Sequence, residues 1–364
     1  MKHNQYCVIM AGGYGKRFWP ICRENMPKQF MDMTELGTSF LRAAYERCSS
    51  LFPPENIIII TLEKYKELVK SQVPEIQDEN LLLEPFGRKT AACIAYSTYT
   101  ILKRDPEAVV AVTPSDLVIS DTEEFSTTLS KAMEYAKVNQ VLMTLGIRPT
   151  HPDPNFGYIQ IKGGKDACSD DKPIKVKTFT EKPDPSLAEV FWKSGEFFWN
   201  SGIFVWKASV IKEELEKYLP DITELFTGWD KALGSPSEKS FIERVYADCE
   251  KISIDYGVME KTDKVWLFPA NFGWCDIDNW DAYYRNYKKK DEVNNICNSD
   301  RQCLEDAEDN LIISKDRKKL IAIKGLKDYM VIDTGDVLMI CPKDDEKYKE
   351  LLAKTGMPGY EEFR

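Results

Sequence analysis

The sequence is poor in the residues that most often build metal or disulfide sites. Only two histidines, His3 and His151, occur among 364 residues, and the ten cysteines include no CxxC pair. Without paired cysteines or grouped histidines, the sequence predicts neither a zinc site nor a disulfide framework. It favours free thiols in a reducing cytoplasm.

Long hydrophobic runs and excess positive charge are also lacking. No apolar run approaches the roughly 20 residues of a membrane-spanning helix, and residues 1–5, MKHNQ, lead into the first apolar run without a secretory pattern. The net charge of −10 argues against general nucleic-acid binding. We therefore expect a cytoplasmic protein with one large and one small domain, or two of ordinary size, bound to neither membrane nor nucleic acid.

The sequence does contain a glycine cluster followed by basic residues. An apolar run, Tyr6–Met10, predicts a buried strand that ends at this cluster. The glycines are Gly12, Gly13 and Gly15, and the basic residues that follow are Arg17, Arg23 and Lys28. Glycines allow a sharp turn that exposes backbone N–H groups, and spaced Arg and Lys complement a polyphosphate. A tight turn with solvated basic side chains has the same composition, so the local pattern leaves both interpretations open.

Strands and helices then alternate along the chain. Unbroken apolar or β-branched runs predict buried strands, and apolar residues at helical spacing predict helices. The predicted strands cover 56–61, 108–113 and 140–147, the helices cover 39–51 and 63–71, and a short strand, a turn and a helix start fall within 81–92. This order is typical of a parallel sheet covered by helices.

An aspartate follows one of these strands directly. Asp116 comes just after the strand at 108–113, where open α/β sheets bind ligands at the carboxyl ends of their strands. Magnesium prefers one or two carboxylates together with phosphate oxygens and water, so Asp116 is a candidate Mg²⁺ ligand. Alternatively, it caps the helix that starts at Thr122.

From residue 156 onward the pattern changes to alternation. Segments 156–162 and 174–180 predict antiparallel strands, and the second ends at Glu181 and Lys182. Asn200 precedes a further apolar strand, and its amide offers both a donor and an acceptor to the hydroxyls of a hexose. Both stretches also have the composition of ordinary turns.

The last part of the chain predicts a separate small element. The basic run 288–290 and the polar segment 291–309 are interpreted as a boundary and linker. Four short strands at 310–314, 320–324, 329–333 and 337–341 suit stacked β coils or a compact sheet, and 344–354 predicts a terminal helix.

The string GGYGKRFWPICRENMPKQF at residues 12–30 resembles the N-terminal signature of the sugar-1-phosphate nucleotidyltransferases. It is most similar to the mannose-1-phosphate guanylyltransferase family. The strings LLLEPFGRKTAA, TPSD, FWNSGIFVW and GWCDIDNW follow in the family's order. The resemblance implies an α/β fold: a Rossmann-like mixed-sheet nucleotidyltransferase domain, residues 1–287. A short left-handed β-helix-like domain with a terminal helix, residues 288–364, would follow it.

The resemblance also implies an activity and its residues. GMP would pass from GTP to α-D-mannose 1-phosphate, giving GDP-mannose and pyrophosphate by Mg²⁺-assisted in-line attack on the α-phosphorus. The residues implied in catalysis are Arg17, Lys28 and Lys182. Those implied in nucleotide binding are Gly12, Gly13, Gly15, Arg88 and Thr90. Those implied in binding the sugar phosphate are Gly157, Glu181, Lys182 and Asn200. The implied metal ligands are Asp116 and Asp276, 160 residues apart, which form one site only if the fold brings them together.

Two departures from the family pattern leave questions open. Lys89 stands where the family has asparagine, near the nucleotide base, and Asp278 stands where it has glycine. The alternatives are a transferase for another hexose 1-phosphate or nucleoside triphosphate, and a non-catalytic sugar-nucleotide sensor. The expected partners are GTP, mannose 1-phosphate and a second copy of the chain, a dimer formed through the C-terminal domain.

Overall fold

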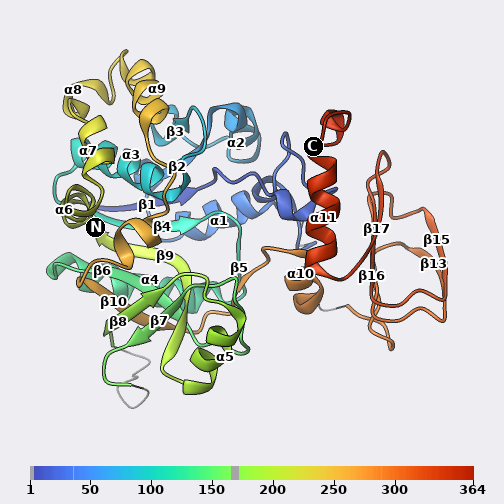
Figure 1. The fold of residues 1–364 in the computed structure, drawn as a ribbon. Helices are drawn as coiled ribbons and strands as arrows, with labels where there is room; N and C mark the ends of the chain where they lie inside the picture. The colour runs from blue at the N-terminus through green and yellow to red at the C-terminus, as the bar shows by residue number, and fades with distance from the viewer. Residues whose placement is uncertain (1–3, 36, 165–171, 288) are drawn as a thin grey trace. The chain divides into compact units, whose positions relative to one another are not determined.

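The computed structural model describes residues 4–35, 37–164, 172–287 and 289–364, which form two compact units (Figure 1). Unit 1 comprises Met1–Gly12 and Gly37–Cys275, and unit 2 comprises Gly13–Leu36 and Asp276–Arg364. We call the early segment of unit 2, Gly13–Leu36, the basic loop. The predicted domain boundary falls at residue 288, outside the described residues, and stays a prediction.

Unit 1 is built on a mixed sheet of nine strands in the order β3-β2-β1-β4-β9-β6-β10-β8-β7. The strands are β1 (Gln5–Met10), β2 (Ile57–Leu62), β3 (Leu81–Glu84), β4 (Val109–Pro114), β6 (Leu142–Ile147), β7 (Tyr158–Ile161), β8 (Ile174–Thr180), β9 (Phe197–Lys207) and β10 (Val265–Ala270). The first four are parallel, whereas β9 is antiparallel to β4 and β6, and β8 to β7 and β10. The mixed α/β sheet predicted from the sequence is confirmed.

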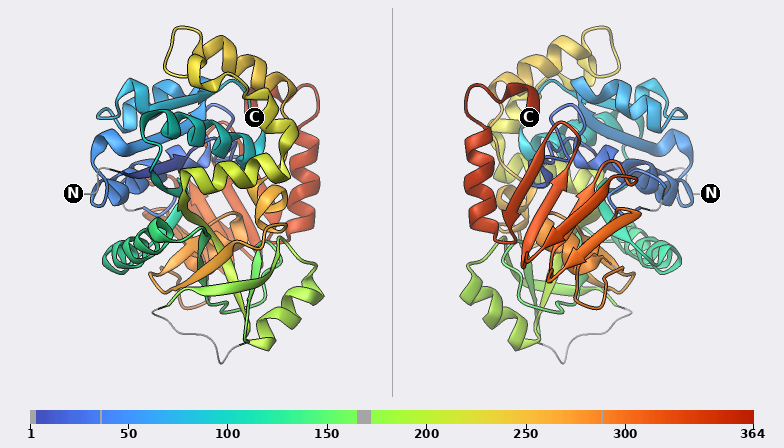
Figure 2. Two further views of the ribbon diagram at one scale, coloured as in Figure 1. Left: turned by 90° about the vertical axis from the view of Figure 1, so that its left-hand side faces the viewer. Right: turned by 90° about the vertical axis from the view of Figure 1, so that its right-hand side faces the viewer.

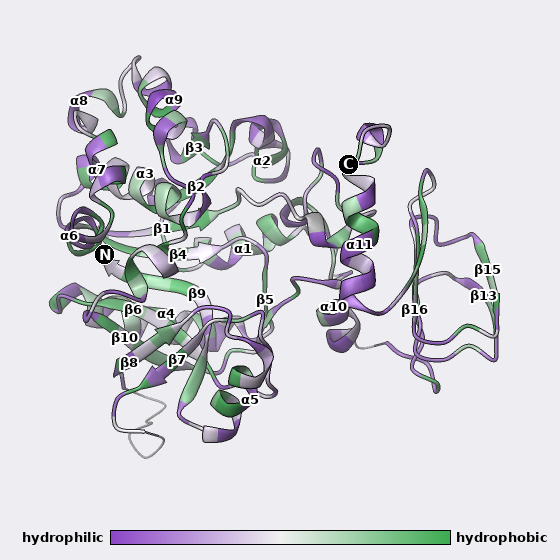
Figure 3. Cartoon of the chain, viewed as in Figure 1, coloured by the Kyte–Doolittle hydropathy of each residue, from purple (hydrophilic) through white to green (hydrophobic). Residues whose placement is uncertain are grey.

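The central strands are buried on both faces because helices cover the sheet. Every residue of β2, Ile57–Leu62, is buried, which explains its unbroken apolar sequence. The helices are α1 (Phe40–Ser49), α2 (Lys66–Gln72), α3 (Lys89–Arg104), α4 (Thr122–Val138), α5 (Pro185–Ser194), α6 (Ala208–Tyr218), α7 (Pro220–Leu225), α8 (Trp229–Ala232) and α9 (Glu238–Asp248). In Figure 3, part of β9 has the green of hydrophobic residues.

Local caps fix where the helices of unit 1 begin. The Ser39 side chain accepts a hydrogen bond from the backbone N–H of Arg42 at the start of α1. Asp121 accepts from Glu124 N–H at 2.9 Å and caps α4. The alternative that Asp116 caps this helix is therefore wrong.

The described residues of unit 2 contain a β-helix-like stack and two α-helices. Its strands are β12 (Ile296–Cys297), β13 (Arg301–Glu305), β14 (Leu311–Ser314), β15 (Leu320–Lys324), β16 (Tyr329–Asp333) and β17 (Leu338–Pro342). They form the sheets β12-β14-β16-β17 and β13-β15, with neighbours parallel except β16 and β17. Figure 2 shows these strands, in its right-hand view, near the terminal helix α11 (Asp345–Thr355). The remaining helix is α10 (Trp280–Asn286).

One sequence interpretation of this region is wrong. Residues 291–309 are not a linker, because β12 and β13 lie within them. An internal hydrogen bond holds successive coils together: the buried Asn310 donates from Nδ2 to Asn295 Oδ1 at 3.0 Å. The four strands expected after residue 309, and the terminal helix, are confirmed.

Two further sequence expectations concern the whole chain. The cysteines that the structure describes are free thiols, as predicted. Among the described residues, no helix combines the length and hydrophobicity needed to cross a membrane.

Candidate active site

The glycine turn begins at the carboxyl end of β1. Gly12 lies against β3, since an added Cβ there would be 2.9 Å from Oε2 of Glu84. In unit 2, Gly15 has φ +60°, and an added Cβ would be 2.7 Å from the backbone nitrogen of Lys28. The Gln29 side chain donates from Nε2 to the carbonyl of Gly13 at 2.8 Å. The turn therefore needs glycine at position 15 for its conformation and its close approach to Lys28.

Two basic residues of the basic loop pair with acidic residues far along the chain. The ammonium of Lys28 lies 3.3 Å from Asp276 Oδ1, and the Lys28 side chain is 5% exposed. Arg17 Nη1 lies 2.5 Å from Asp278 Oδ2, with the Arg17 side chain half-exposed. These predicted residues come together within unit 2, and Asp278 gains a partner that the sequence did not suggest.

Asp116 lies in unit 1, just beyond the end of β4. Strands β1 and β4 are paired in parallel up to Met10 and Pro114, and Ser115 N–H donates to the Met10 carbonyl at 3.0 Å. Asp116 therefore follows the carboxyl end of a strand next to the one that leads into the glycine turn. Because Asp276 belongs to unit 2, a cation shared by the two aspartates stays a prediction.

Arg88 and Thr90 are both engaged with backbone groups of unit 1. The Arg88 guanidinium donates to the carbonyls of Tyr246 and Ala247, each at 2.7 Å, in the last turn of α9. A cation at this place also favours the negative end of the helix dipole. Thr90 Oγ1 accepts from Ile254 N–H at 2.9 Å. Between them, Lys89 has φ +62°.

The residues predicted to bind the sugar phosphate lie together in unit 1. Asn200 N–H donates to the Gly157 carbonyl at 2.8 Å. An added Cβ on Gly157 would lie 2.3 Å from Glu181 Oε2 and 3.2 Å from Asn200 Cβ. The Lys182 ammonium lies 4.0 Å from Glu181 Oε1, and Lys182 has φ +50°. The alternative that Asn200 belongs to a turn is wrong, because β9 continues through it.

Asn200 is held by groups that the sequence did not identify. Its Oδ1 accepts from Thr144 Oγ1 at 3.1 Å and from Gly202 N–H at 3.2 Å. Its Nδ2 donates to Asp255 Oδ1 at 3.0 Å. The amide orientation is therefore fixed, which suits recognition of a hydroxyl.

The pKa values of two acidic groups in this cluster are raised, chiefly by burial. Burial, and then the nearby Asp255, raise the pKa of Glu181 to about 8. Burial likewise raises the pKa of Asp255, partly offset by its hydrogen bonds. Among the described residues, Oε2 of Glu181 is a buried oxygen without a hydrogen-bond partner, so it is available for a hydrogen bond with a hydroxyl group.

Glu84 is a second acidic residue that the sequence analysis did not single out. It is buried at the end of β3, and Tyr246 OH donates to its Oε1 at 2.9 Å. Burial raises its pKa to about 7. The only sequence signal was an acidic residue between a leucine run and Pro85.

Metal binding depends on which side-chain donor atoms the described residues bring together. The described residues contain no group of three or more His, Cys, Asp or Glu arranged to hold a metal. A magnesium ion needs no such group, because one or two carboxylates, phosphate oxygens and water suffice. Asp116 in unit 1 and Asp276 in unit 2 each carry carboxylate oxygens of the kind that this ion prefers, and their use as a pair stays a prediction.

Two family models match the chain. Residues 6–292 match the model for nucleotidyl transferases, and residues 301–354 match the MannoseP isomerase/GMP-like beta-helix domain. These matches agree with the mixed sheet of unit 1 and the stacked strands of unit 2.

Curated and solved relatives extend over nearly the whole chain. A mannose-1-phosphate guanylyltransferase of Escherichia coli is 31% identical over 98% of this chain and 77% of its own length. The mannose-1-phosphate guanylyltransferase RfbM of Salmonella typhimurium is 35% identical over 93% and 69%. A crystal structure from Thermus thermophilus, described as a mannose-1-phosphate geranyltransferase, has a TM-score of 0.83 at 29% identity, covering 97% of this chain and all of that one.

Proposed function

The chain belongs to the nucleotidyl transferase family, and we propose that it transfers GMP from GTP to α-D-mannose 1-phosphate, giving GDP-mannose and pyrophosphate. The observation that carries this proposal is the cluster of Gly157, Glu181, Lys182 and Asn200 in unit 1. A cation beside a fixed amide and a carboxylate is what a sugar phosphate requires: one charge for the phosphate, and acceptors and donors for hydroxyls.

In the proposed reaction a phosphate oxygen of the sugar 1-phosphate attacks the α-phosphorus of GTP. A bond forms between that oxygen and the α-phosphorus. The bond between the α-phosphorus and the oxygen bridging it to the β-phosphorus breaks, and pyrophosphate leaves with that electron pair. A phosphate monoester is already a nucleophile, so positioning and charge neutralisation suffice. Lys182 would align the incoming phosphate, and Arg17 and Lys28 would neutralise the triphosphate.

The nucleotide would lie over the glycine turn. The N–H groups of Gly12, Gly13 and Gly15 would face its phosphates. Asp116 and Asp276 would hold Mg²⁺, which supplies additional charge neutralisation when bound. Arg88 and Thr90 form hydrogen bonds with backbone groups. These bonds favour a role in holding the backbone around the nucleotide base rather than in contacting the base directly.

We also propose that Glu84 selects guanine. Its carboxylate lies beside the glycine turn, and guanine offers two neighbouring N–H donors on its Watson–Crick edge, which suit a carboxylate acceptor. Replacement Glu84→Gln should then lower the preference for GTP over ATP, because the amide presents one donor and one acceptor.

The proposed function is tested by pyrophosphate release with four nucleoside triphosphates and several hexose 1-phosphates, with and without Mg²⁺. GTP with mannose 1-phosphate should give the highest kcat/KM, and chelation of Mg²⁺ should stop the reaction. A preference for another pair would identify a different transferase. GTP binding without pyrophosphate at any Mg²⁺ concentration would identify a sensor.

Two further proposals concern the protein in the cell. We propose a cytoplasmic enzyme that forms a dimer through residues 288–364. Light scattering of the full chain and fractionation of expressing cells test them.

A further inference from the structure

The basic loop is built into unit 2 by contacts with the end of the chain. We propose that Tyr348 of α11 and Asp336 of the turn between β16 and β17 are positioning residues that hold the basic loop in its nucleotide-binding conformation. This inference rests on the proposed function, because it assigns the loop to GTP.

The first contact is at the carbonyl of Trp19. Tyr348 OH donates to this oxygen at 3.0 Å, and Trp280 Nε1 donates to it at 3.3 Å. Tyr348 and Trp280 are both buried, so the backbone at Trp19 receives two directed bonds away from water. Neither donor belongs to the basic loop.

The ring of Trp19 makes a second contact with the same end of the chain. Its Nε1 donates to the carbonyl of Phe363 at 2.7 Å. The neighbouring Phe18 packs edge-to-face on Trp280, with ring centroids 5.0 Å apart. Trp19 is thus tied to α10, α11 and the final residues of the chain.

The third contact is at Arg23. Its Nη2 donates to Thr334 Oγ1 at 3.2 Å and to Asp336 Oδ1 at 3.1 Å, while Nε donates to the Pro20 carbonyl at 2.7 Å. The Arg23 side chain is 13% exposed. Arg23 therefore fastens the basic loop to the turn between β16 and β17 in the same unit, although the sequence analysis placed it among the phosphate-binding cations.

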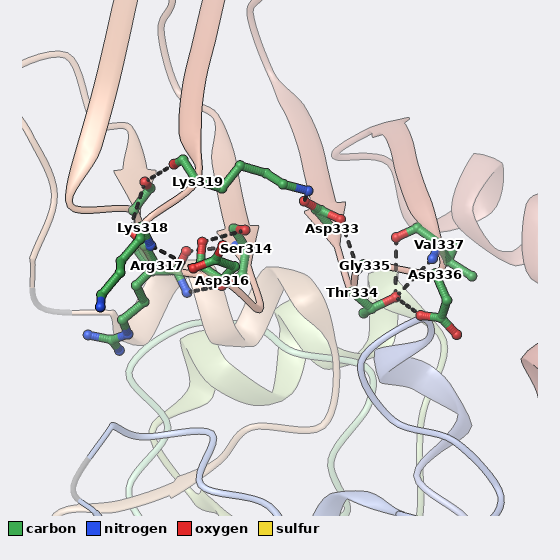
Figure 4. A network of polar contacts seen from close by, with 12 residues as sticks. Ser314, Asp316, Arg317, Lys318, Lys319, Asp333, Thr334, Gly335, Asp336 and Val337 are labelled. Carbon is green, nitrogen blue, oxygen red and sulfur yellow. Dashed lines mark hydrogen bonds and ion pairs between the residues drawn. The ribbon is translucent and has the colours of Figure 1, made fainter.

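The turn that receives Arg23 is itself braced. Thr334 Oγ1 donates to Asp336 Oδ1 at 2.8 Å, and Gly335 N–H donates to Asp333 Oδ1 at 2.9 Å. Lys319, one coil away, pairs with Asp333 (Figure 4). The turn that carries Thr334 and Asp336, the side-chain acceptors of Arg23, is thus held by the β stack.

These contacts bear on the nucleotide because they flank its proposed cationic ligands. Arg17 precedes Trp19 by two residues, and Lys28 follows Arg23 by five. The sugar-phosphate cluster lies in unit 1 and shares none of these bonds. Weakening the support should therefore affect GTP and leave the sugar phosphate unaffected.

The test compares Tyr348→Phe and Asp336→Asn with the matched controls Tyr360→Phe and Asp328→Asn. Tyr360 is exposed, and Asp328 lies in unit 2 and pairs with Lys343 rather than with the basic loop. The first two variants should raise KM for GTP about 3- to 10-fold, the effect of one lost hydrogen bond, with KM for mannose 1-phosphate within about 2-fold. The controls should leave both unchanged.

A second readout does not require activity. Amide hydrogen exchange of residues 13–30 should be faster in Tyr348→Phe and Asp336→Asn than in the wild type and the controls. The inference would be overturned if the two variants shifted both KM values equally. It would also be overturned if they changed neither the exchange rate nor KM for GTP. If the wild type releases no pyrophosphate, the proposed function fails. The exchange measurement still tests the inference: faster exchange in the two variants shows that Tyr348 and Asp336 hold the loop, and unchanged exchange shows that they do not.

Discussion

The ammonium of Lys28 lies 3.3 Å from a carboxylate oxygen of Asp276, although 248 residues separate the two along the chain. The pair joins the two segments of unit 2 and places a nearly buried cation beside a predicted metal ligand. A charge that is fixed before the substrate arrives stabilises transition-state charge without reorganisation.

Replacement of Lys28 by alanine should lower kcat about 100-fold or more, because a fixed cation for the triphosphate is lost. Asp276→Ala should have an effect of similar size. Steady-state pyrophosphate release measures both. Lys207→Ala serves as the control, because Lys207 lies in unit 1 and pairs there with Glu107. Full activity in Lys28→Ala and Asp276→Ala would contradict the proposed mechanism.

Gly15→Ala should weaken GTP binding and destabilise the fold. The positive φ of Gly15 costs an L-residue about 1–2 kcal/mol, and its Cβ would meet the Lys28 nitrogen at 2.7 Å. Thermal unfolding and GTP titration measure the two effects. Gly37→Ala is the control for strain alone, since Gly37 also has positive φ but nothing lies within 4 Å of its added Cβ. Equal GTP affinity in the two variants would contradict the role given to Gly15.

Gly157→Ala should raise KM for the sugar phosphate and leave KM for GTP nearly unchanged. The added methyl group would displace the Glu181 carboxylate, 2.3 Å away, and press on Asn200. Initial rates at saturating GTP and varied mannose 1-phosphate give the answer. An increase confined to KM for GTP would show that this cluster binds the nucleotide.

The pKa of Glu181 predicts a specific pH dependence of stability. Burial, followed by the neighbouring Asp255, raises this pKa to about 8. Between about pH 5 and pH 8 the unfolded chain then binds fewer protons at this carboxyl than the folded chain, so the free energy of unfolding falls as pH rises. Glu181→Gln should remove this fall in the free energy of unfolding. From about pH 5 to pH 8, the free energy of unfolding of the variant should therefore rise by a few kcal/mol relative to that of the wild type. Urea unfolding at four pH values measures the difference; parallel curves would contradict the raised pKa.

Arg88→Ala should affect stability more than nucleotide affinity. Two hydrogen bonds from a charged donor to the last turn of α9 would be lost, which is expected to cost roughly 2–4 kcal/mol. Denaturant unfolding and GTP titration separate the two effects. A large loss of GTP affinity with unchanged stability would instead assign Arg88 to direct nucleotide contact.

Much of the fold could be predicted because the buried strands have unbroken apolar sequences, as in Ile57–Leu62. The strand Arg301–Glu305 was missed because its side chains are largely exposed and carry no alternating apolar pattern. Gly157, Glu181 and Asn200 were each predicted from separate motifs, but their order along the chain could not show that they lie together. Asp255 was missed because its only signal is an acidic residue in an otherwise apolar helical turn, and its partner Asn200 is 55 positions away.

The membership of the basic loop in unit 2 has a consequence for how the protein is made. On a ribosome, Gly13–Leu36 emerges early, but the segment it packs with begins only at Asp276. At about 5 to 20 residues per second, the intervening roughly 240 residues take on the order of 12 to 50 s to synthesise. During that interval the basic loop, which holds both cations proposed to bind the triphosphate, is attached to β1 but lacks its packing partner in the last quarter of the polypeptide.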